Sequence, residues 1–503
     1  MPDPISIRVE TNQPATMRDG TLLYADVYRP DGPGPFPTIL QRTPYDKASP
    51  LSALMLDPMK AARAGFALVI QDTRGRYTSG GEFYCFVDDI NDGYDTVEWA
   101  ASQPWSSGRP PHLAAIAPNV TASNYHDGWT YQGGAFELGF NVSWTMLQLT
   151  LANFKTHSAV KNIPQARGAE LLKAGGLADY FFDWLEHPSY DDYWEKLCVE
   201  DQHSNINVPA LNIGGWYDIF LGGTIRNFLG MREKGATEDA RRGQKLIIGP
   251  WQHGSRGGSM AGDHYFGVAA DAMALGLDEI HLRWFQHWLN GQDTGLLDEP
   301  PVKIFVMGDD VWRDENEWPL ARAQATSYYL HSGGNANTLH GDGGLSPVPP
   351  ADEPPDIFLY NPANPVPTRG GPLCCNPYFA ANGAFNQKEI EARPDVLVYS
   401  TPELERDVEV TGPVTVTLWA ATSATDTDFT AKLVDVCEDG CARNLTDGII
   451  RARYRESMSS PSLVDPGRAY CYTIDLWATS NVFKAGHKVR LEVSSSNFSP
   501  LRP

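Results

Sequence analysis

Two loops of this sequence carry residues suited to acid–base chemistry. The run NIGGWYDIF (212–220) leaves an apolar stretch and delivers Asp218, and LIIGPWQHG (246–254) leaves the next such stretch and delivers His253. A carboxylate that accepts a hydrogen bond from an imidazole orients the ring, and the ring can then take a proton from a nucleophile. Because each residue follows a strand-like run, we expect both side chains at the carboxyl edge of one parallel sheet. The pair predicts the acid and the base of a catalytic triad.

Each of these residues also has an ordinary structural interpretation. An Asp that follows a strand often caps the next helix, and a His in a Trp-rich loop is often only packed and hydrogen-bonded. The ordered pair of Asp218 and His253 favours chemistry over either interpretation alone. Tyr45, in RTPYDK (42–47), follows a third strand-like run and could donate its phenol to a developing oxyanion. The alternative for Tyr45 is an aromatic side chain that Pro44 holds in place.

A nucleophile should precede this pair on a strand–turn–helix elbow of the form G-x-S-x-G. No such elbow is present in the chain. Ser79, Ser255 and Ser259 stand beside glycines but lack a glycine at both flanking offsets after a strand. Ser106 and Ser107 follow the end of a predicted helix, with no apolar strand before them. The cysteines stand in no elbow either, so the sequence predicts an acid and a base without a recognisable nucleophile.

The elements that must position these residues begin with antiparallel strands and continue as strands alternating with helices. Apolar and alternating runs predict strands over 5–10, 21–30, 36–45, 67–75 and 112–120, and helices over 57–65 and 91–104. This order predicts an α/β fold with a mostly parallel sheet that helices cover.

The pattern changes twice further along the chain. Residues 128–205 hold aromatic helical stretches such as 177–194 and no convincing apolar strand, which predicts a helical cap over the site. Strands return at 208–215 and 245–250, with helices predicted over 222–235 and 277–291. From residue 301 apolar residues alternate with period two, which indicates a β-sandwich or jelly roll. We therefore expect a core over 1–127 and 206–300, a cap over 128–205 and a sandwich over 301–503.

Charge and composition exclude several functions. The net charge is −22, so a nucleic acid would be repelled. The N-terminus MPDPISIRVE has no signal-peptide pattern, and no run of eighteen apolar residues predicts a membrane span. The seven cysteines are odd in number and have no zinc-site spacing, so we expect mostly buried free thiols, a cytoplasmic protein and no metal. These features leave the oligomeric state open.

Several segments in a fixed order carry a resemblance to a known family. They are MRDGTLLYADVYRP, TPYDK, VIQDTRGRYTSGGEF, GWYDIF, GPWQHG, NPVPTRGGPLCCN (364–376) and LWAATSATDTDFTAKLVDV (418–436). Together they resemble the CocE/NonD acyl hydrolases, the group of cocaine esterase and Xaa-Pro dipeptidyl-peptidase-like enzymes. The resemblance runs from Met17 to Phe498. It implies an α/β-hydrolase core, a helical cap and a C-terminal jelly roll.

The same resemblance implies a function and roles for three residues. The function is hydrolysis of small esters or amides through a serine, without a metal or an organic cofactor. Asp218 would be the acid, His253 the base and Tyr45 an oxyanion donor. The chain departs from the family where QPWSSG (103–108) is followed directly by RPPHLAAIAPNV (109–120). In the family a strand, the G-x-S-x-G elbow and a helix lie between these segments, so on the order of 20 residues are absent.

Three hypotheses follow. The first is an acyl hydrolase with a substitute nucleophile, in which His253→Ala abolishes ester cleavage. The second is a non-catalytic protein, either degenerate or shortened by a gene-prediction error; the end at NFSPLRP, before further jelly-roll strands of the family, is consistent with it. The third is a carbohydrate-binding jelly roll over 306–503. The cap aromatics have two interpretations, pocket lining or cap core; they are Tyr180, Phe181, Phe182 and Trp184.

Overall fold

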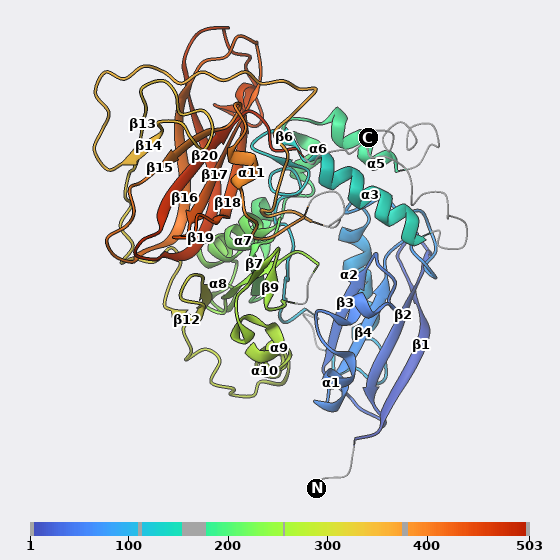
Figure 1. Cartoon of the computed structure of the whole chain (residues 1–503). Helices are drawn as coiled ribbons and strands as arrows, with labels where there is room; N and C mark the ends of the chain where they lie inside the picture. Colours follow the sequence, from blue (N-terminus) through green and yellow to red (C-terminus); the bar gives the residue numbers. More distant parts are fainter. Residues whose placement is uncertain (1–4, 109–112, 153–177, 255–256, 375–380, 499–503) are drawn as a thin grey trace.

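The computed structural model describes residues 5–108, 113–152, 178–254, 257–374 and 381–498. The junction residues 109–112, Ser255 and Cys375 therefore lie outside the described residues. The chain forms an α/β core, a helical cap and a C-terminal β-sandwich, as predicted (Figure 1). The core holds two separate four-stranded sheets rather than one continuous sheet. We call them the first sheet and the second sheet.

The first sheet has strands from the N-terminal quarter of the chain, with β3 at one edge. β3 runs parallel to β4, and the other neighbouring strands pair antiparallel. Every residue of β4 is buried, which explains its continuous apolar run and the polar Asp72 at its end. In order across the sheet the strands are β1 (Ile7–Thr16), β2 (Leu22–Pro30), β4 (Ala67–Asp72) and β3 (Thr38–Thr43), accompanied by helices α1 (Pro58–Arg63) and α2 (Asp89–Ala101).

The second sheet supplies the edge at which Asp218 and His253 lie. Its strands β7 and β8 are parallel, so the loops after them leave the sheet on the same side. β11 pairs parallel with β8, and β12 pairs antiparallel with β11. The second sheet therefore includes residues up to Glu315, beyond the core boundary expected at residue 300. The elements are β7 (Leu211–Tyr217), β8 (Lys245–Gln252), β11 (Val302–Val306), β12 (Val311–Glu315), α7 (Leu221–Lys234), α8 (Glu238–Arg242), α9 (Ala272–Leu275) and α10 (Leu277–Asn290).

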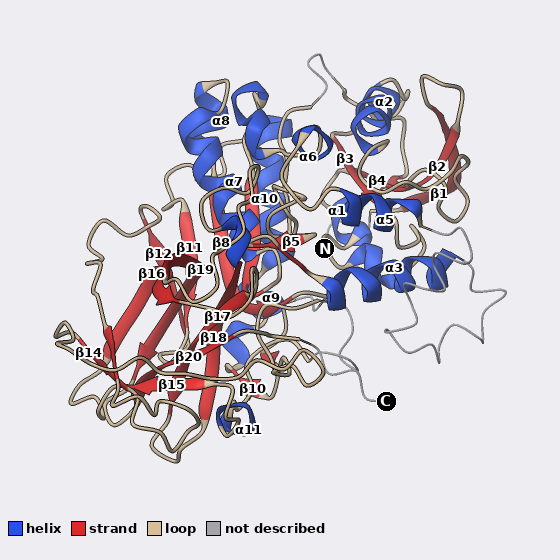
Figure 2. Cartoon of the chain, turned by 90° about the horizontal axis from the view of Figure 1, so that it is seen from above, coloured by secondary structure: helices blue, strands red, loops and turns tan. Residues whose placement is uncertain are grey.

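The buried strand expected over 112–120 is not formed, and this part of the prediction was wrong. The segment lies parallel to β7 but makes only two isolated bridges, Ile116 with Ala210 and Asn119 with Ile213. Pro118 has no N–H to donate, and the other side of the segment faces a cavity rather than a described strand. Figures 1 and 2 show the two sheets on opposite sides of the middle of the molecule.

The cap is built on aromatic side chains. A cluster of buried rings joins its helices, and Trp129 lies edge-on to Trp144 and to Trp184 with centroids 5.1 Å apart in both pairs. Tyr180, Phe181 and Trp184 are fully buried in this cluster and do not line the cavity, so they are cap core. The described cap elements are β5 (Tyr131–Gln132), β6 (Ala135–Phe136), α3 (Leu138–Ala152), α5 (Asp179–Glu186) and α6 (Asp192–Glu195).

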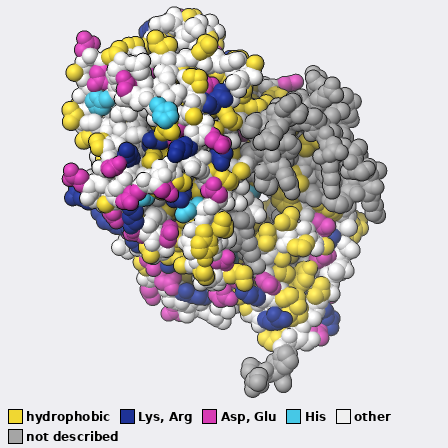
Figure 3. Space-filling model, viewed as in Figure 1, with side chains coloured by type: hydrophobic (Ala, Val, Ile, Leu, Met, Phe, Trp, Pro, Cys, Tyr) yellow, Lys and Arg dark blue, Asp and Glu magenta, His cyan; other side chains and the backbone are white. Residues whose placement is uncertain are grey.

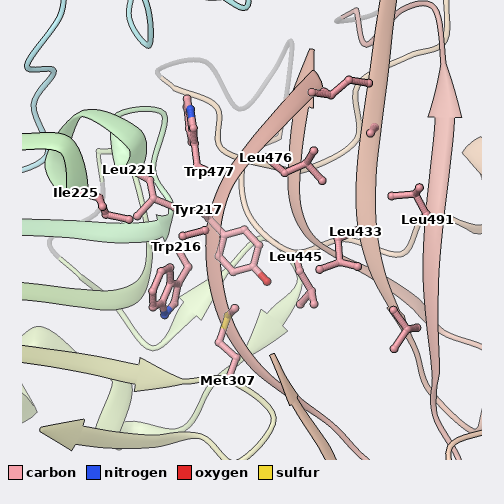
Figure 4. Packing of buried hydrophobic residues seen from close by; sticks show 14 of the residues in the cluster. Trp216, Tyr217, Leu221, Ile225, Met307, Leu433, Leu445, Leu476, Trp477 and Leu491 are labelled. Carbon is pink, nitrogen blue, oxygen red and sulfur yellow. The ribbon is translucent and has the colours of Figure 1, made fainter. Parts of the chain in front are cut away.

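The sandwich shares one apolar core with the second sheet. Trp216 and Tyr217 of β7 and Met307 after β11 pack with Leu445 and Leu476 of the sandwich (Figure 4). A six-stranded sheet of order β13-β14-β15-β20-β17-β18 faces the ribbon β16-β19. The elements are β13 (Tyr329–His331), β14 (Gly344–Ser346), α11 (Lys388–Glu391), β15 (Leu397–Ser400), β16 (Val408–Ala420), β17 (Asp428–Val436), β18 (Ala442–Arg451), β19 (Tyr470–Phe483) and β20 (Lys488–Ser494).

A buried carboxyl of the sandwich makes a pH-dependent contribution to stability. Burial raises the pKa of Asp447, on β18, to about 6. Between the unfolded value of about 4 and this folded value, the folded state keeps a proton that the unfolded state has lost, so the unfolding free energy falls as pH rises. We expect Asp447→Asn to remove this loss.

The measurement is the melting temperature of both proteins from pH 4 to pH 7, by circular dichroism. Relative to the parent, Asp447→Asn should become more stable as the pH increases. Exposed Asp352→Asn is the control and should keep a constant offset. A constant offset for Asp447→Asn as well would contradict the prediction.

The surface charge, the helices and the cysteines can be compared with the expectations of no nucleic acid, no membrane span and no metal. Figure 3 shows acidic side chains with basic ones between them, rather than a basic patch. None of the described helices has the length and apolar character to cross a membrane. Within the described ranges no three His, Cys, Asp or Glu side chains gather in a way that could hold a metal ion. Cys374 is disulfide-bonded, which the spacing of the cysteines does not predict. The free cysteines among the described residues are Cys85, Cys198, Cys437, Cys441 and Cys471.

Candidate active site

Asp218 lies in the turn between β7 and α7 and uses its two carboxylate oxygens differently. Oδ1 accepts the backbone N–H of Phe220 at 2.7 Å, just before α7 begins. Oδ2 lies 3.1 Å from Nδ1 of His253. The side chain is 1% exposed, so both contacts are shielded from water. Oδ1 therefore contacts the backbone at the start of α7, as expected for a helix-capping Asp, and Oδ2 contacts His253, as expected for the acid of a triad.

His253 follows β8, and its ring is held by a contact of Nδ1 with Asp218 and by the ring of Phe220. The ring of Phe220 meets it edge-on with centroids 5.0 Å apart, and Asn382 Nδ2 donates to the His253 carbonyl at 3.2 Å. With Nδ1–H donated to Asp218, the ring presents the lone pair of Nε2. Among the described residues, none forms a hydrogen bond with this nitrogen, and His253 lines the cavity. The nitrogen is placed to accept a proton from a molecule in the cavity.

Tyr45 lines the same cavity from the loop after β3. Its hydroxyl oxygen accepts the indole N–H of Trp144 at 3.0 Å, so its own proton is left to donate. Burial raises the pKa of Tyr45, which keeps the phenol protonated at neutral pH. Arg76 steadies the loop, because its Nε donates to the carbonyl oxygen of Pro44 at 3.1 Å.

The loop of Tyr45 is tied to the first sheet by a buried ion pair. Lys47 Nζ lies 2.8 Å from Asp72 Oδ2, and the Lys47 backbone N–H donates to Asp72 Oδ1 at 2.7 Å. Both side chains are nearly fully buried. A carboxylate at the end of β4 thus sets the position of the phenol in the cavity.

Several hydroxyl and thiol groups on the cavity wall have other partners or the wrong protonation state, whereas Thr73 Oγ1 is buried without a hydrogen-bond partner among the described residues. Ser52 Oγ donates to the Asp46 carbonyl at 2.7 Å, and Ser106 Oγ lies 2.8 Å from Thr38 Oγ1. Burial raises the pKa of the Cys85 thiol well above its usual value, so it is a weak nucleophile at neutral pH. In the described part of the chain, no serine, threonine or cysteine hydrogen-bonds to His253.

The cavity is large and continues from the site into the space between the two sheets. Its volume is about 2000 Å³, whereas pockets for small ligands are typically about 300–1,000 Å³. Near His253 the wall is aromatic. These rings belong to Phe86, Tyr125, Trp129, Phe140, Trp144 and Phe220. The sequence did not predict them as a group, because they come from segments far apart in the chain. The only local signal was an indole N–H within the apolar run GFNVSWTMLQL.

Two family models match the chain. Residues 19–109 and 109–255 match the X-Pro dipeptidyl-peptidase family S15, and residues 294–501 match the C-terminal non-catalytic domain of X-Pro dipeptidyl-peptidases. The first match is broken at Arg109, where the sequence departs from the family pattern.

Known proteins resemble the chain over nearly its whole length. Cocaine esterase of Rhodococcus sp. strain MB1 Bresler is 38% identical over 532 residues, which cover 97% of this chain and 91% of that protein. A putative serine esterase of Mycobacterium bovis is 25% identical, with 96% and 90% covered. A solved α-amino acid ester hydrolase has a TM-score of 0.79 at 24% identity, with 100% and 91% covered, which confirms the predicted fold class.

Proposed function

From the premise that this chain belongs to the CocE/NonD family of hydrolases, we propose that it binds small esters or amides at His253 without the nucleophile for rapid turnover. One observation carries the proposal: the Asp218–His253 pair is formed, while its Nε2 faces the cavity without a described hydroxyl or thiol partner. Asp218 acts as the acid, His253 as the base and Tyr45 as an oxyanion donor. The missing part is the residue that would form the acyl-enzyme.

The remaining groups support only slow hydrolysis. Nε2 of His253 takes a proton from water, the water oxygen bonds to the substrate carbonyl carbon, and Tyr45 donates a hydrogen bond to the resulting oxyanion. The alcohol or amine then leaves with the proton that His253 returns. In a well-studied protease, loss of the triad serine costs about 10⁶ in turnover, and about 10³–10⁴ over the uncatalysed rate remains. We expect activity of that residual order.

The aromatic wall near His253 favours esters with an aromatic or other flat apolar group. Trp129, Trp144 and Phe220 lie in the same cluster as the cap core and border the cavity. Ring stacking and apolar burial would hold such a group while the carbonyl lies toward Tyr45. Five described cysteines are free and support the cytoplasm as the proposed compartment, while the disulfide at Cys374 is the one observation against it among the described cysteines.

The test is covalent labelling with a fluorophosphonate, read by intact mass of the folded protein. We expect no mass addition, together with slow cleavage of 4-nitrophenyl benzoate that His253→Ala abolishes. Exposed His340→Ala is the matched control and should leave that slow cleavage unchanged. Addition of one probe that depends on His253 would show that a serine of this chain acts as nucleophile, and the proposal would be wrong.

A further inference from the structure

We propose that Cys437 and Cys441 are a reversible modification site, at which oxidation by a small-molecule disulfide closes a disulfide across the turn of the β17–β18 hairpin. Both thiols are free and partly exposed. Closure involves neither His253 nor ester hydrolysis, so it is independent of the function proposed above. The register of the two strands, the turn between them and the charged groups beside them support this site.

The pairing of β17 with β18 places the two cysteines directly opposite each other. Val436 pairs with Ala442 at the last position of the ladder before the turn. One step nearer the turn, the Cys437 N–H donates to the Cys441 carbonyl oxygen at 2.8 Å, which continues the same register. Hydrogen-bonded opposite residues of antiparallel strands have Cα atoms about 5.5 Å apart, and their side chains leave the same face of the sheet. Disulfides span Cα separations of about 4.4–6.8 Å, so this pair has the backbone spacing of a disulfide.

The turn between the cysteines holds them in this register while both are thiols. Gly440 adopts a left-handed conformation with a φ of 80°, and its N–H donates to the Cys437 carbonyl oxygen at 2.9 Å. Asp439 Oδ1 accepts the Cys441 N–H at 2.9 Å. Because these contacts already fix the end of the hairpin, closing the disulfide costs little additional chain entropy.

The charged groups near the thiols set their reactivity. Burial raises the pKa of both thiols, that of Cys437 to about 11, and the positive charge of Arg443 opposes this rise in each. Nearby carboxylates also favour the protonated thiols; they are Asp263, Asp435 and Asp439. At neutral pH both groups are therefore mainly thiols. Because the thiolate is the attacking species, the exchange is slow at neutral pH and its rate increases with pH.

The oxidation takes place in two exchange steps. One cysteine thiolate bonds to a sulfur of the small disulfide, whose S–S bond breaks, and one small thiolate leaves. The second cysteine thiolate then bonds to the sulfur of the first cysteine and expels the other small thiolate. The protein dithiol loses two electrons, the small disulfide is reduced to two thiols, and these take the two cysteine protons. Because the second cysteine lies opposite the first, the mixed disulfide is displaced rather than retained.

The experiment treats the folded full chain with oxidised glutathione and maps its tryptic peptides after acid quenching and alkylation. Cleavage after Lys432 and Arg443 releases residues 433–443, which hold both cysteines of the pair and no other. We expect this peptide to lose two hydrogens, to resist alkylation and to return to the dithiol with dithiothreitol. Its rate of closure should increase by about tenfold per pH unit from pH 7 to pH 9. Exposed Cys471 is the internal control and should keep glutathione as a mixed disulfide.

Two variants separate closure from modification of single thiols. Cys437→Ser and Cys441→Ser each leave one thiol of the pair, which should retain glutathione as a stable mixed disulfide. In the parent, the closed form should exchange its amide hydrogens more slowly over 436–442 than the dithiol form. Absence of the closed form would overturn the proposal, whether the peptide stays a dithiol, keeps glutathione or links to another cysteine. Closure at a rate that does not depend on pH would also overturn it.

Discussion

Turnover of small esters is expected to rise by about 10⁴-fold or more when a strand–turn–helix segment with a central serine is inserted between Gly108 and Arg109. The Asp218–His253 pair is formed and Tyr45 lines the same cavity, so under the proposed function the insertion adds the one missing reacting group. The inserted strand also pairs the open edge of β3. The measurement is kcat/KM for 4-nitrophenyl benzoate on the parent and on the insertion variant.

Two controls separate chemistry from folding in this experiment. The same insertion with Ala in place of the serine should fold equally well and keep the slow parental rate. The serine insertion combined with His253→Ala should lose the gain, because the serine then has no base. Equal rates for the serine and alanine insertions, in folded proteins, would show that Asp218 and His253 do not form a working acid–base pair.

The elements around the site were predictable because each has a strong local signal. The runs 67–75 and 245–250 are mostly apolar and are followed or ended by polar residues, and they correspond to β4 and β8. The helix over 277–291 was bounded by its four-residue apolar spacing and by Gly291, which indeed takes a left-handed conformation after Asn290. In these places local pattern and tertiary pairing agree.

The segment 112–120 shows where a local pattern fails. Its apolar residues predict burial, and Ala115 is buried. A strand, however, needs partners for its backbone, and here only β7 supplies them. A pattern of side chains reports burial but not whether a second edge is present.

The residues of the candidate site also fall into two groups: those that the sequence predicts and those that it does not. Asp218 and His253 could be predicted, because each follows a strong strand signal in the order that triad chemistry requires. Trp144 and Asn382 could not, because a helix of the cap and a loop of the sandwich bring them to the site across long stretches of chain. Contacts of this kind depend on tertiary packing and have no short-range signature.

Removal of Lys47 is expected to destabilise the fold by about 3–5 kcal/mol, since it leaves the Asp72 carboxylate buried without an opposite charge, with only the Thr78 hydroxyl and backbone N–H groups as donors. The Lys47 side chain is 4% exposed and that of Asp72 is 0% exposed, so water cannot replace the ammonium. Lys47→Ala should therefore lower the free energy of unfolding, measured by urea titration. It should also slow ester cleavage, because the same pair positions the loop of Tyr45.

A partly exposed ion pair provides the control. Lys60 Nζ lies 2.8 Å from Asp278, the same distance as in the buried pair, but the Lys60 side chain is 43% exposed while that of Asp278 is 8% exposed. Lys60→Ala should cost less than about 1 kcal/mol, because exposed pairs are screened by solvent. Since the two pairs have equal lengths and both carboxylates are largely buried, a difference between the variants reports the burial of the lysine side chain. Equal losses in both variants would mean that Asp72 finds another partner or water.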